Sequence, residues 1–444
     1  LAHKLEKEKL TKRSIDLEHD FFLCLEKMQS NGVEFDTTAC AKLYTKLLDG
    51  KHEILKEIAK VFPPETITTK TVAYYTDDEG NKYRIKSDAP SSIRPRLQAG
   101  PLKTKQVPFN PNSRQQIAEA FIDKYGWKPK ELSPTGKPRV DEDILKGLKY
   151  PEAKLIAEYM MICKRIGQVA EGTNAWLKLA KQSRIYGRIN HNGALSGRCT
   201  HNTPNMSQVP AVRAPYGEEC RSVFTVKKGY KMVGADMSGL ELRCLAHYMA
   251  EWDNGEYANE ILSGDIHTMN QWAANLDTRD QAKTFIYAFL YGGGNQKLGE
   301  IVSGNATHGK HLRHTFLSTL PALNTLITKV KAVANMRGWL RGLDGRPLPV
   351  RSEHSAMNLL MQSTGAILMK KATVLLMKAI DTEELDAKLV LHVHDEVQLE
   401  VREDQAERVG QLAVQTMKQA GESFSLRIPL DGEYKIGNTW AETH

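Results

Sequence analysis

Two segments of this sequence could bring carboxylates together at one end of a β-sheet. Tyr230–Ala235 is a short apolar run that predicts a strand, and Asp236 follows it directly. Further along, two β-rich runs within Leu389–Val401 flank a His-Asp-Glu sequence centred on Asp395, which leaves room only for a tight hairpin turn. If the first strand pairs with this hairpin, Asp236 and Asp395 meet at the same end of the sheet. Their oxygens could then share two Mg²⁺ ions, an arrangement that serves phosphoryl transfer.

Each of these residues also has an ordinary structural interpretation. An isolated aspartate after a strand, such as Asp236, is often the N-cap of the next helix. His394 and a second histidine, His267, could equally be core or capping residues. Because they occur together with a third motif, we favour a catalytic role for them over these structural roles.

A helix predicted from Arg279 to Tyr291 supplies that third motif. Arg279, Lys283, Tyr287 and Tyr291 are four residues apart, so each lies only about 40° round the helix from the one before. The cations could hold a triphosphate and Tyr287 could stack on a base or sugar. An amphipathic helix with a solvated basic edge would show the same spacing. Because Gly292–Gly294 follows this helix, we expect a helix C-terminus there and not a phosphate-binding loop.

These motifs lie within an α+β pattern. Apolar residues recur at helical spacing over residues 11–61, 113–181 and much of 240–379, and a Gly- and Pro-rich segment at 185–219 separates the first helical half from the strands. The predicted strand and hairpin lie on either side of the long helical stretch, so they must pair across it. We therefore expect an antiparallel sheet domain with two helical appendages.

Composition limits the class of protein. The 444 residues are 41% hydrophobic, enough for sizeable cores, and the net charge of +8 favours acidic partners without identifying them. No uncharged apolar stretch approaches the roughly 20 residues of a membrane-spanning helix. The six cysteines are far apart and match no zinc or disulfide pattern, which favours a reducing cytoplasm. The sequence begins at Leu1 and its first residues show no charged-then-apolar pattern, so no secretory signal is expected in it.

Part of one Pro-rich segment, residues 63–108, is strongly basic. Within it, Lys82–Lys105 contains seven basic residues and one acid, Asp88. Helical spacing is absent here, so we expect irregular structure. The segment could be a solvated surface loop, or an inserted basic arm for nucleic acid or a protein partner.

Taken together, the motifs resemble those of the family A (DNA polymerase I-like) DNA polymerases, and within them the replicative polymerases of T-seven-like bacteriophages. The resemblance extends over most of the chain and includes polymerase motifs A, B and C in order, with a Ser-Gly-Arg element. The matching segments are Ile15–His19, Phe109–Arg114, Lys164–Gln168, Gly193–His201, Val212–Glu218, Asp236–His247, Gly264–Thr268, the helix from Arg279, Gly342–Arg346, Leu360–Gln362 and His394–Glu396.

The resemblance implies roles for individual residues at the active site. The implied ligands of two Mg²⁺ ions are Asp236, Asp395 and the backbone carbonyl of Met237. The implied contacts to an incoming deoxynucleoside triphosphate are Arg279, Lys283 and His267. Lys283 would also donate a proton to the departing pyrophosphate.

Other residues would select the nucleotide and hold the DNA. Glu241, beside Tyr287, would block a ribose 2′-hydroxyl, and Tyr291 would stack near the templating base. Minor-groove acceptors at the primer end would be contacted by Arg198, Gln362 and His394, contacts that test pair shape without reading sequence. Lys164 and Arg165 would also bind DNA, and Glu396 would have a supporting role.

The implied fold is the right-hand polymerase architecture, α+β, with an antiparallel palm sheet and a helical thumb and fingers. The implied divisions are a thumb at 1–180 with a basic insertion at 63–108, a palm at 181–246 and 359–444, and fingers at 247–358. Family members often carry a proofreading exonuclease upstream, but the match begins near Ile15, so we expect none in this chain. In the phage relatives a longer thumb insertion binds thioredoxin as a processivity factor, which makes residues 63–108 the candidate site for such a partner.

The expected function is template-directed extension of a DNA primer with dNTPs, in the cytoplasm of a bacterial host. A two-metal nuclease would use the same aspartates but needs no triphosphate-binding face. A non-catalytic nucleic-acid scaffold needs neither feature. A single-subunit RNA polymerase shares the palm, and Glu241 next to an aromatic residue is the feature that favours a DNA polymerase.

Overall fold

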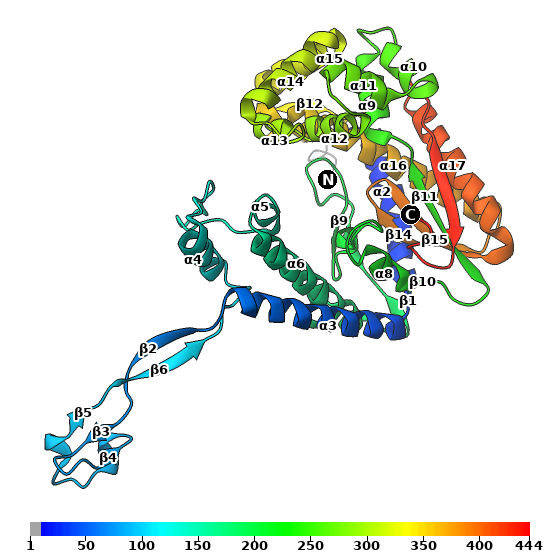
Figure 1. The fold of residues 1–444 in the computed structure, drawn as a ribbon. Coiled ribbons are helices and arrows are strands. Elements are labelled where there is room, and N and C mark those ends of the chain that lie inside the picture. The colour runs from blue at the N-terminus through cyan, green and yellow to red at the C-terminus, as the bar shows by residue number, and fades with distance from the viewer. Residues whose placement is uncertain (1–9) are drawn as a thin grey trace. The chain divides into compact units, whose positions relative to one another are not determined.

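The computed structural model describes residues 10–444 and divides into two compact units (Figure 1). The first, here called the helical unit, is Ala41–Ala175. The second, here called the sheet unit, combines the described residues up to Cys40 with Trp176–His444. None of the helices within residues 10–444 is long and apolar enough to cross a membrane.

A four-stranded antiparallel sheet lies at the centre of the sheet unit. Its order is β14 (Ala387–Val393), β15 (Glu396–Arg402), β11 (Tyr230–Met237) and β16 (Gly432–Gly437). The predicted strand and hairpin therefore form and pair, and the α+β prediction is confirmed. β15 is buried over six of its seven residues, in keeping with its run of Val and Leu at alternating positions.

Three helices cover this sheet in two layers: α2 (Lys12–Asn31) and α17 (Ala406–Ser423) pack on the strands, and α16 (Ala356–Thr382) packs on these two helices. α2 lies on β14, α17 lies on β11 and β16, and α16 packs against both helices. The apolar stripe of α2, which includes Leu17 and Phe21, is buried in the same hydrophobic core as residues of β11, β15 and α16. The division expected at residue 180 grouped α2 with the helical half of the chain, whereas in the structure this stripe joins it to the sheet.

A helical region connects β11 to α16. Its helices are α9 (Leu240–Met249), α10 (Glu256–Ser263), α11 (Ile266–Ala274), α12 (Arg279–Leu290), α13 (Asn295–Glu300), α14 (Ala306–Thr319) and α15 (Pro321–Arg337), followed by the paired strands β12 (Trp339–Arg341) and β13 (Pro347–Pro349). Side-chain oxygens of Asp265 and Thr278 cap the starts of α11 and α12.

The glycine run after α12 ends that helix, as expected, and also begins the next one. α12 ends as predicted, with Tyr291 as its C-cap and Gly292 in a left-handed conformation (φ +77°). Gly294, however, is also the N-cap of the short helix α13. The run thus ends one helix and begins another.

Short elements complete the sheet unit. They are β1 (Val33–Phe35), β7 (Arg184–Ile185) and β10 (Phe224–Thr225) in one small sheet, the pair β8 (Arg188–Asn190) and β9 (Thr200–Asn202), and the helices α7 (Trp176–Leu179) and α8 (Gly217–Ser222). The turn between β8 and β9 contains the Ser-Gly-Arg element.

The helical unit is built on α3 (Thr37–Val61), which begins in the sheet unit, with α4 (Arg114–Tyr125), α5 (Glu142–Lys146) and α6 (Pro151–Ile166). Phe62 stacks on Phe109 with ring centroids 4.5 Å apart, and Phe121 packs edge-on against Phe62. Aromatic packing therefore closes the base of the segment between α3 and α4.

The prediction of irregular structure over residues 63–108 was wrong. This segment, here called the arm, is an antiparallel ladder of β2 (Glu65–Val72) and β6 (Leu102–Val107) that leads to a small sheet of β3 (Tyr75–Thr76), β4 (Lys82–Tyr83) and β5 (Gln98–Ala99) (Figure 1). β2 reads Glu-Thr-Ile-Thr-Thr-Lys-Thr-Val, so its β-branched residues favour a strand. Both faces of the ladder are largely exposed, which removes the apolar alternation that normally signals a strand.

Candidate active site

Strand pairing brings the two predicted carboxylates to one end of the sheet. Asp236 lies opposite Glu396 in the β11–β15 register, and Asp395 occupies the two-residue turn before β15. The backbone amide of Met237 donates to the carbonyl of Asp395 over 3.2 Å, so the two segments are in direct contact. His394, the other turn residue, has a left-handed backbone (φ 57°), as a tight hairpin requires.

The electrostatics of this sheet end oppose two ionised carboxylates. Desolvation, with the nearby charge of Glu241, raises the pKa of Asp395 to about 6. Desolvation also raises the pKa of Asp236, and Glu396 and Glu433 raise it further. Neither Asp236 nor Asp395 forms an ion pair with a basic side chain within residues 10–444. Asp236 does not cap α9 either, because Gly239 occupies that position.

Glu396 differs from the two aspartates because it is buried and well partnered. Its Oε1 accepts from Gln398 (2.6 Å) and from the Trp440 indole, and its Oε2 lies 2.9 Å from His444 Nδ1 and 3.7 Å from Arg221. Burial disfavours the ionised form, but the interactions with His444 and Arg221 bring the pKa of Glu396 below its usual value. This arrangement suits a supporting residue beneath the sheet end.

A second cluster lies on α11 and α12. Arg279 and Lys283 are exposed on one face of α12, and the rings of His267 and Tyr287 are 6.4 Å apart. Burial together with the charges of Arg279 and Lys283 lowers the pKa of His267. Burial raises the pKa of Tyr287, and Glu241 and Asp395 raise it further, so Tyr287 lies between the cationic face and the carboxylates.

The structure adds a partner for Arg279 that sequence reasoning missed. The Arg279 Nε and Nη2 atoms donate to the two oxygens of Asp265 over 2.7 and 3.1 Å. Asp265 was part of the matched Gly264–Thr268 segment, but only the fold reveals that the cap of α11 faces the first turn of α12. Lys283 forms no ion pair within the described residues, so its charge is available at this surface.

Glu241 connects a third set of side chains. Its Oε1 accepts from the Tyr291 hydroxyl (2.7 Å) and lies 3.5 Å from Arg198 Nη2. Burial lowers the pKa of His394, and the positive charge of Arg198 lowers it further, so His394 borders the same cluster. The bond between Tyr291 and Glu241 was not foreseen, because spacing along α12 carries no information about α9.

Comparison with known proteins decides the family. The sequence pattern of DNA polymerase family A matches residues 95–442. This chain belongs to DNA polymerase family A. It is 40% identical to the DNA-directed DNA polymerase of Enterobacteria phage T3 and 39% identical to that of Escherichia phage T7, in each case over 97% of this chain and 70% of the phage protein. The thermostable DNA polymerase I of Thermus filiformis is 30% identical over 78% of this chain and 43% of that protein.

A solved structure shows the same fold. The POL domain of Pol1 from M. smegmatis, in complex with DNA primer-template and dNTP, matches 96% of this chain and 70% of that chain with a TM-score of 0.77 at 19% identity. The family A polymerase described here is therefore a DNA-directed DNA polymerase with the fold that the motifs implied. A nuclease, a non-catalytic scaffold and an RNA polymerase are excluded as its class.

Family A DNA polymerases are metal-dependent. Within residues 10–444 no group of three or more His, Cys, Asp or Glu side chains is arranged to hold a metal ion. Magnesium does not need one, because it is usually held by one or two carboxylates together with substrate phosphates. The adjacent backbone positions of Asp236 and Asp395 at this sheet end, with neither carboxylate in an ion pair within residues 10–444, fit a divalent cation.

The remaining predicted residues lie on α16 and in the helical unit. Gln362 lies on α16 and is partly exposed. Lys164 and Arg165 lie on α6 in the helical unit, where Lys164 is exposed. Arg165 is 9% exposed and its Nη1 donates to Gln168 over 2.8 Å, so of the two only Lys164 presents its charge at the surface.

The raised pKa of Asp395 predicts a pH-dependent stability in metal-free protein. The folded value of about 6 exceeds the unfolded value of 3.8, so the folded state is favoured below pH 4 and this advantage disappears as the pH rises through 6. Asp395→Asn should therefore stabilise the protein at pH 8 by up to about 3 kcal/mol and have little effect at pH 4. Urea unfolding in EDTA across this range measures it, with Asp381→Asn as an exposed control. Equal effects of Asp395→Asn at both pH values would contradict the assignment.

Proposed function

We propose that this polymerase extends a DNA primer with dNTPs at the β11–β15 end of the sheet, with Asp236 and Asp395 as ligands of two Mg²⁺ ions. The observation that carries this proposal is that Asp236 and Asp395 meet at one end of the sheet, with Asp395 close enough to Tyr287 of α12 to raise its pKa, which links this sheet end to the cationic face of α12. Bound there, two Mg²⁺ ions would lower the pKa of the primer 3′-hydroxyl and stabilise the charge that develops on the leaving pyrophosphate. The Met237 carbonyl is the proposed third protein ligand.

The α12 face would hold the triphosphate. Arg279 supplies a bidentate donor, Lys283 a point charge, and His267 a further donor when it is correctly protonated. The Asp265 carboxylate already accepts both hydrogen bonds from the Arg279 guanidinium. Phosphate oxygens would therefore have to displace this carboxylate or share the guanidinium with it. Lys283 would donate the proton that the leaving pyrophosphate requires. Movement of α12 towards a correct base pair would complete the site and give selection by induced fit.

Sugar and base selection would depend on the Glu241 cluster. Tyr287 lies near Glu241, and a carboxylate at that position leaves no room for a ribose 2′-hydroxyl. Tyr291 would break its hydrogen bond to Glu241 and then stack near the templating base. Arg198, Gln362 and His394 would contact minor-groove acceptors at the primer end, and Arg198 and His394 already border the same cluster.

The parts of the chain would carry the names of the right-hand architecture. The thumb, expected at 1–180, would hold the duplex with Lys164 and the arm, although its α2 packs with the sheet, while 181–246 with 359–444 would form the palm and 247–358 the fingers. Template and primer are the proposed macromolecular substrate, as in the M. smegmatis complex. The cytoplasm of a bacterial host is the proposed compartment.

The arm would bind duplex DNA through its phosphates. Arg84, Arg96 and Lys105 are exposed on it and form no ion pair within residues 10–444. Its tip is organised internally, with Lys82 over the Tyr74 ring and Asp77 accepting from the Tyr83 hydroxyl (2.9 Å). A stiff, basic hairpin of this kind would prolong binding to DNA and leave the chemical step alone.

The first prediction tests the catalytic assignment. Asp236→Ala and Asp395→Ala should each abolish nucleotide incorporation and leave duplex binding largely intact, because each removes a proposed metal ligand and no thumb residue. Primer extension and DNA-binding isotherms measure the two properties. Asp381→Ala, at an exposed site on α16, is the matched control. Extension above a few per cent of wild type in either active-site variant would refute the two-metal assignment.

A second prediction concerns sugar selection. Glu241→Ala should admit ribonucleotides, because it opens space at the 2′ position, and should slow dNTP incorporation, because Tyr291 and Arg198 no longer share a partner. The measurement is the ratio of incorporation efficiencies for a ribonucleotide and its deoxy equivalent. Tyr291→Phe removes only the bond to Glu241 and serves as the control. An unchanged ratio in Glu241→Ala would place the sugar gate elsewhere.

A third prediction concerns the arm. Replacing Glu65–Val107 with a short Gly-Ser turn should shorten products made in the presence of trap DNA and leave the single-turnover rate unchanged. The salt slope of DNA binding should fall by roughly 0.9 for each DNA phosphate that the protein no longer neutralises. An Arg84→Ala/Arg96→Ala/Lys105→Ala variant separates charge from the fold of the arm. If product length changes only when a thioredoxin-like protein is added, the arm binds that protein and not DNA.

A further inference from the structure

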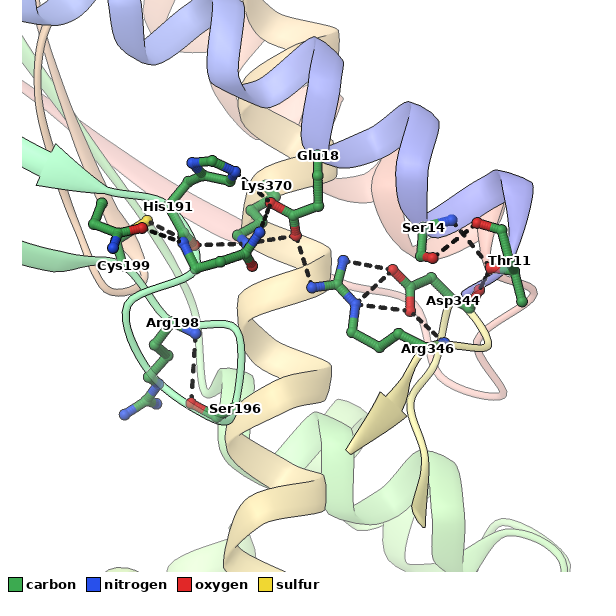
Figure 2. A network of polar contacts seen from close by, with 12 residues as sticks. Thr11, Ser14, Glu18, His191, Ser196, Arg198, Cys199, Asp344, Arg346 and Lys370 are labelled. Carbon is green, nitrogen blue, oxygen red and sulfur yellow. Dashed lines mark hydrogen bonds and ion pairs between the residues drawn. The ribbon is translucent and has the colours of Figure 1, made fainter. Parts of the chain in front are cut away.

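A buried cluster of charges lies close to the active site without belonging to it. It joins Glu18 of α2, Lys370 of α16, and Asp344 and Arg346 of the β12–β13 turn (Figure 2). Glu18 Oε1 lies 2.6 Å from Lys370 Nζ and 2.7 Å from Arg346 Nη1, and Arg346 Nη2 lies 2.6 Å from Asp344. Two acids and two bases therefore balance in a site where Lys370 is 1% exposed.

The cluster forms hydrogen bonds with the turn between β8 and β9. Besides Glu18, Lys370 Nζ donates to the backbone carbonyl of His191 (2.9 Å) and to Asn192 Oδ1 (3.3 Å), which uses all three of its protons. Asn192 Nδ2 in turn donates to Glu18 Oε2 over 3.1 Å. One end of the turn is thereby bonded to both charges of the central ion pair.

The other end of the turn packs against the Arg346 side chain. Gly197 has a left-handed backbone (φ +75°), and a Cβ placed on it would lie 3.0 Å from Arg346 Nη1. The turn is also closed on itself, because Gly197 N donates to Ala194 O (2.9 Å) and Ala194 N donates to Arg198 O (3.3 Å). Its path is therefore defined from both ends.

This turn carries Arg198. Figure 2 shows the Arg198 side chain pointing away from the charge cluster, on the far side of the turn. There its Nη2 lies 3.5 Å from Glu241 Oε1. The backbone of the turn thus connects the buried ion pairs with a side chain proposed to contact the primer end.

Stability alone is a poor reason for such a cluster. Replacing buried ion pairs with apolar side chains of similar volume is often neutral or stabilising, whereas charges with fixed directions can specify one geometry. We propose that Lys370, together with Glu18, is a positioning residue that fixes the turn 191–199 and so sets the reach of Arg198 into the minor groove at the primer end. This inference rests on the proposed role of Arg198.

A double-mutant cycle between Lys370 and Arg198 tests the proposal. The variants are Lys370→Met, Arg198→Ala and their combination, and the readout is the single-turnover rate of dNTP incorporation on a matched primer–template. Lys370→Met should lower this rate roughly tenfold in the wild-type background and less than about twofold in the Arg198→Ala background. Lys378→Met, which breaks the exposed α16–α2 ion pair with Asp20, is the matched control and should leave the rate unchanged.

A second substrate gives a readout that a purely structural role would not affect. A primer whose terminal base lacks the minor-groove acceptor should slow the wild-type enzyme, because Arg198 then has no acceptor at the primer end. The same primer should slow Lys370→Met little or not at all. Thermal unfolding of each variant shows whether it is folded under the assay conditions.

Two further variants keep the test decisive if Lys370→Met does not fold. Glu18→Gln/Lys370→Met removes one acid and one base and so keeps the cluster neutral, and Asn192→Ala alters only an exposed turn residue. Each of these variants should also lower the single-turnover rate more in the wild-type background than in the Arg198→Ala background. Effects that add in full to that of Arg198→Ala would overturn the positioning role and leave the proposed function standing. If Arg198→Ala itself has no effect, the primer-end role of Arg198 fails and this inference fails with it.

Discussion

Two carboxylates whose ionisation is disfavoured by burial and by neighbouring glutamates lie together at one end of a sheet, and the rest of the sheet unit has to hold them there. Desolvation and neighbouring acids raise the pKa of both Asp236 and Asp395, so the site is electrostatically unfavourable until a cation binds. The β11–β15 pairing holds both residues in place, because the free energy of the buried ladder and of the core packed on it offsets the unfavourable electrostatic energy of the two carboxylates. Such a strained site is a common feature of catalytic centres.

The side chains proposed to bind the nucleotide and the primer end are paired with acidic side chains of the same chain. The Asp265 carboxylate accepts two hydrogen bonds from Arg279. Glu241 accepts a hydrogen bond from Tyr291 and forms an ion pair with Arg198. These bonds keep long side chains ordered before a ligand arrives, which reduces the entropic cost of binding. They are also exposed or half-buried, so the free energy needed to exchange them is modest.

The parts of this picture that depend on local sequence could be predicted. A β-rich hairpin around Asp395 and a four-residue repeat along α12 are visible in short windows, and both formed as expected. The arm was missed because a ladder exposed on both faces lacks apolar alternation. The bonds of Asp265 with Arg279 and of Glu18 with Lys370 were missed for a different reason. Each joins segments whose proximity is decided only by tertiary packing, over 14 and 352 positions respectively.

Several buried cations of the sheet unit hold segments that border the site. Arg243 Nε donates to the carbonyl of Ser238, two residues after Asp236, and Arg221 lies 3.7 Å from Glu396. Arg184 joins Glu400, on the same strand as Glu396, to Glu34 of β1. In each case an arginine bonds to the backbone or to a glutamate of a segment that carries a proposed catalytic or supporting residue. Hydrophobic burial could supply the stability, but it is non-directional, whereas a charged hydrogen bond specifies both distance and angle. Chemistry that requires groups within fractions of an ångström explains why buried charge is retained at these positions.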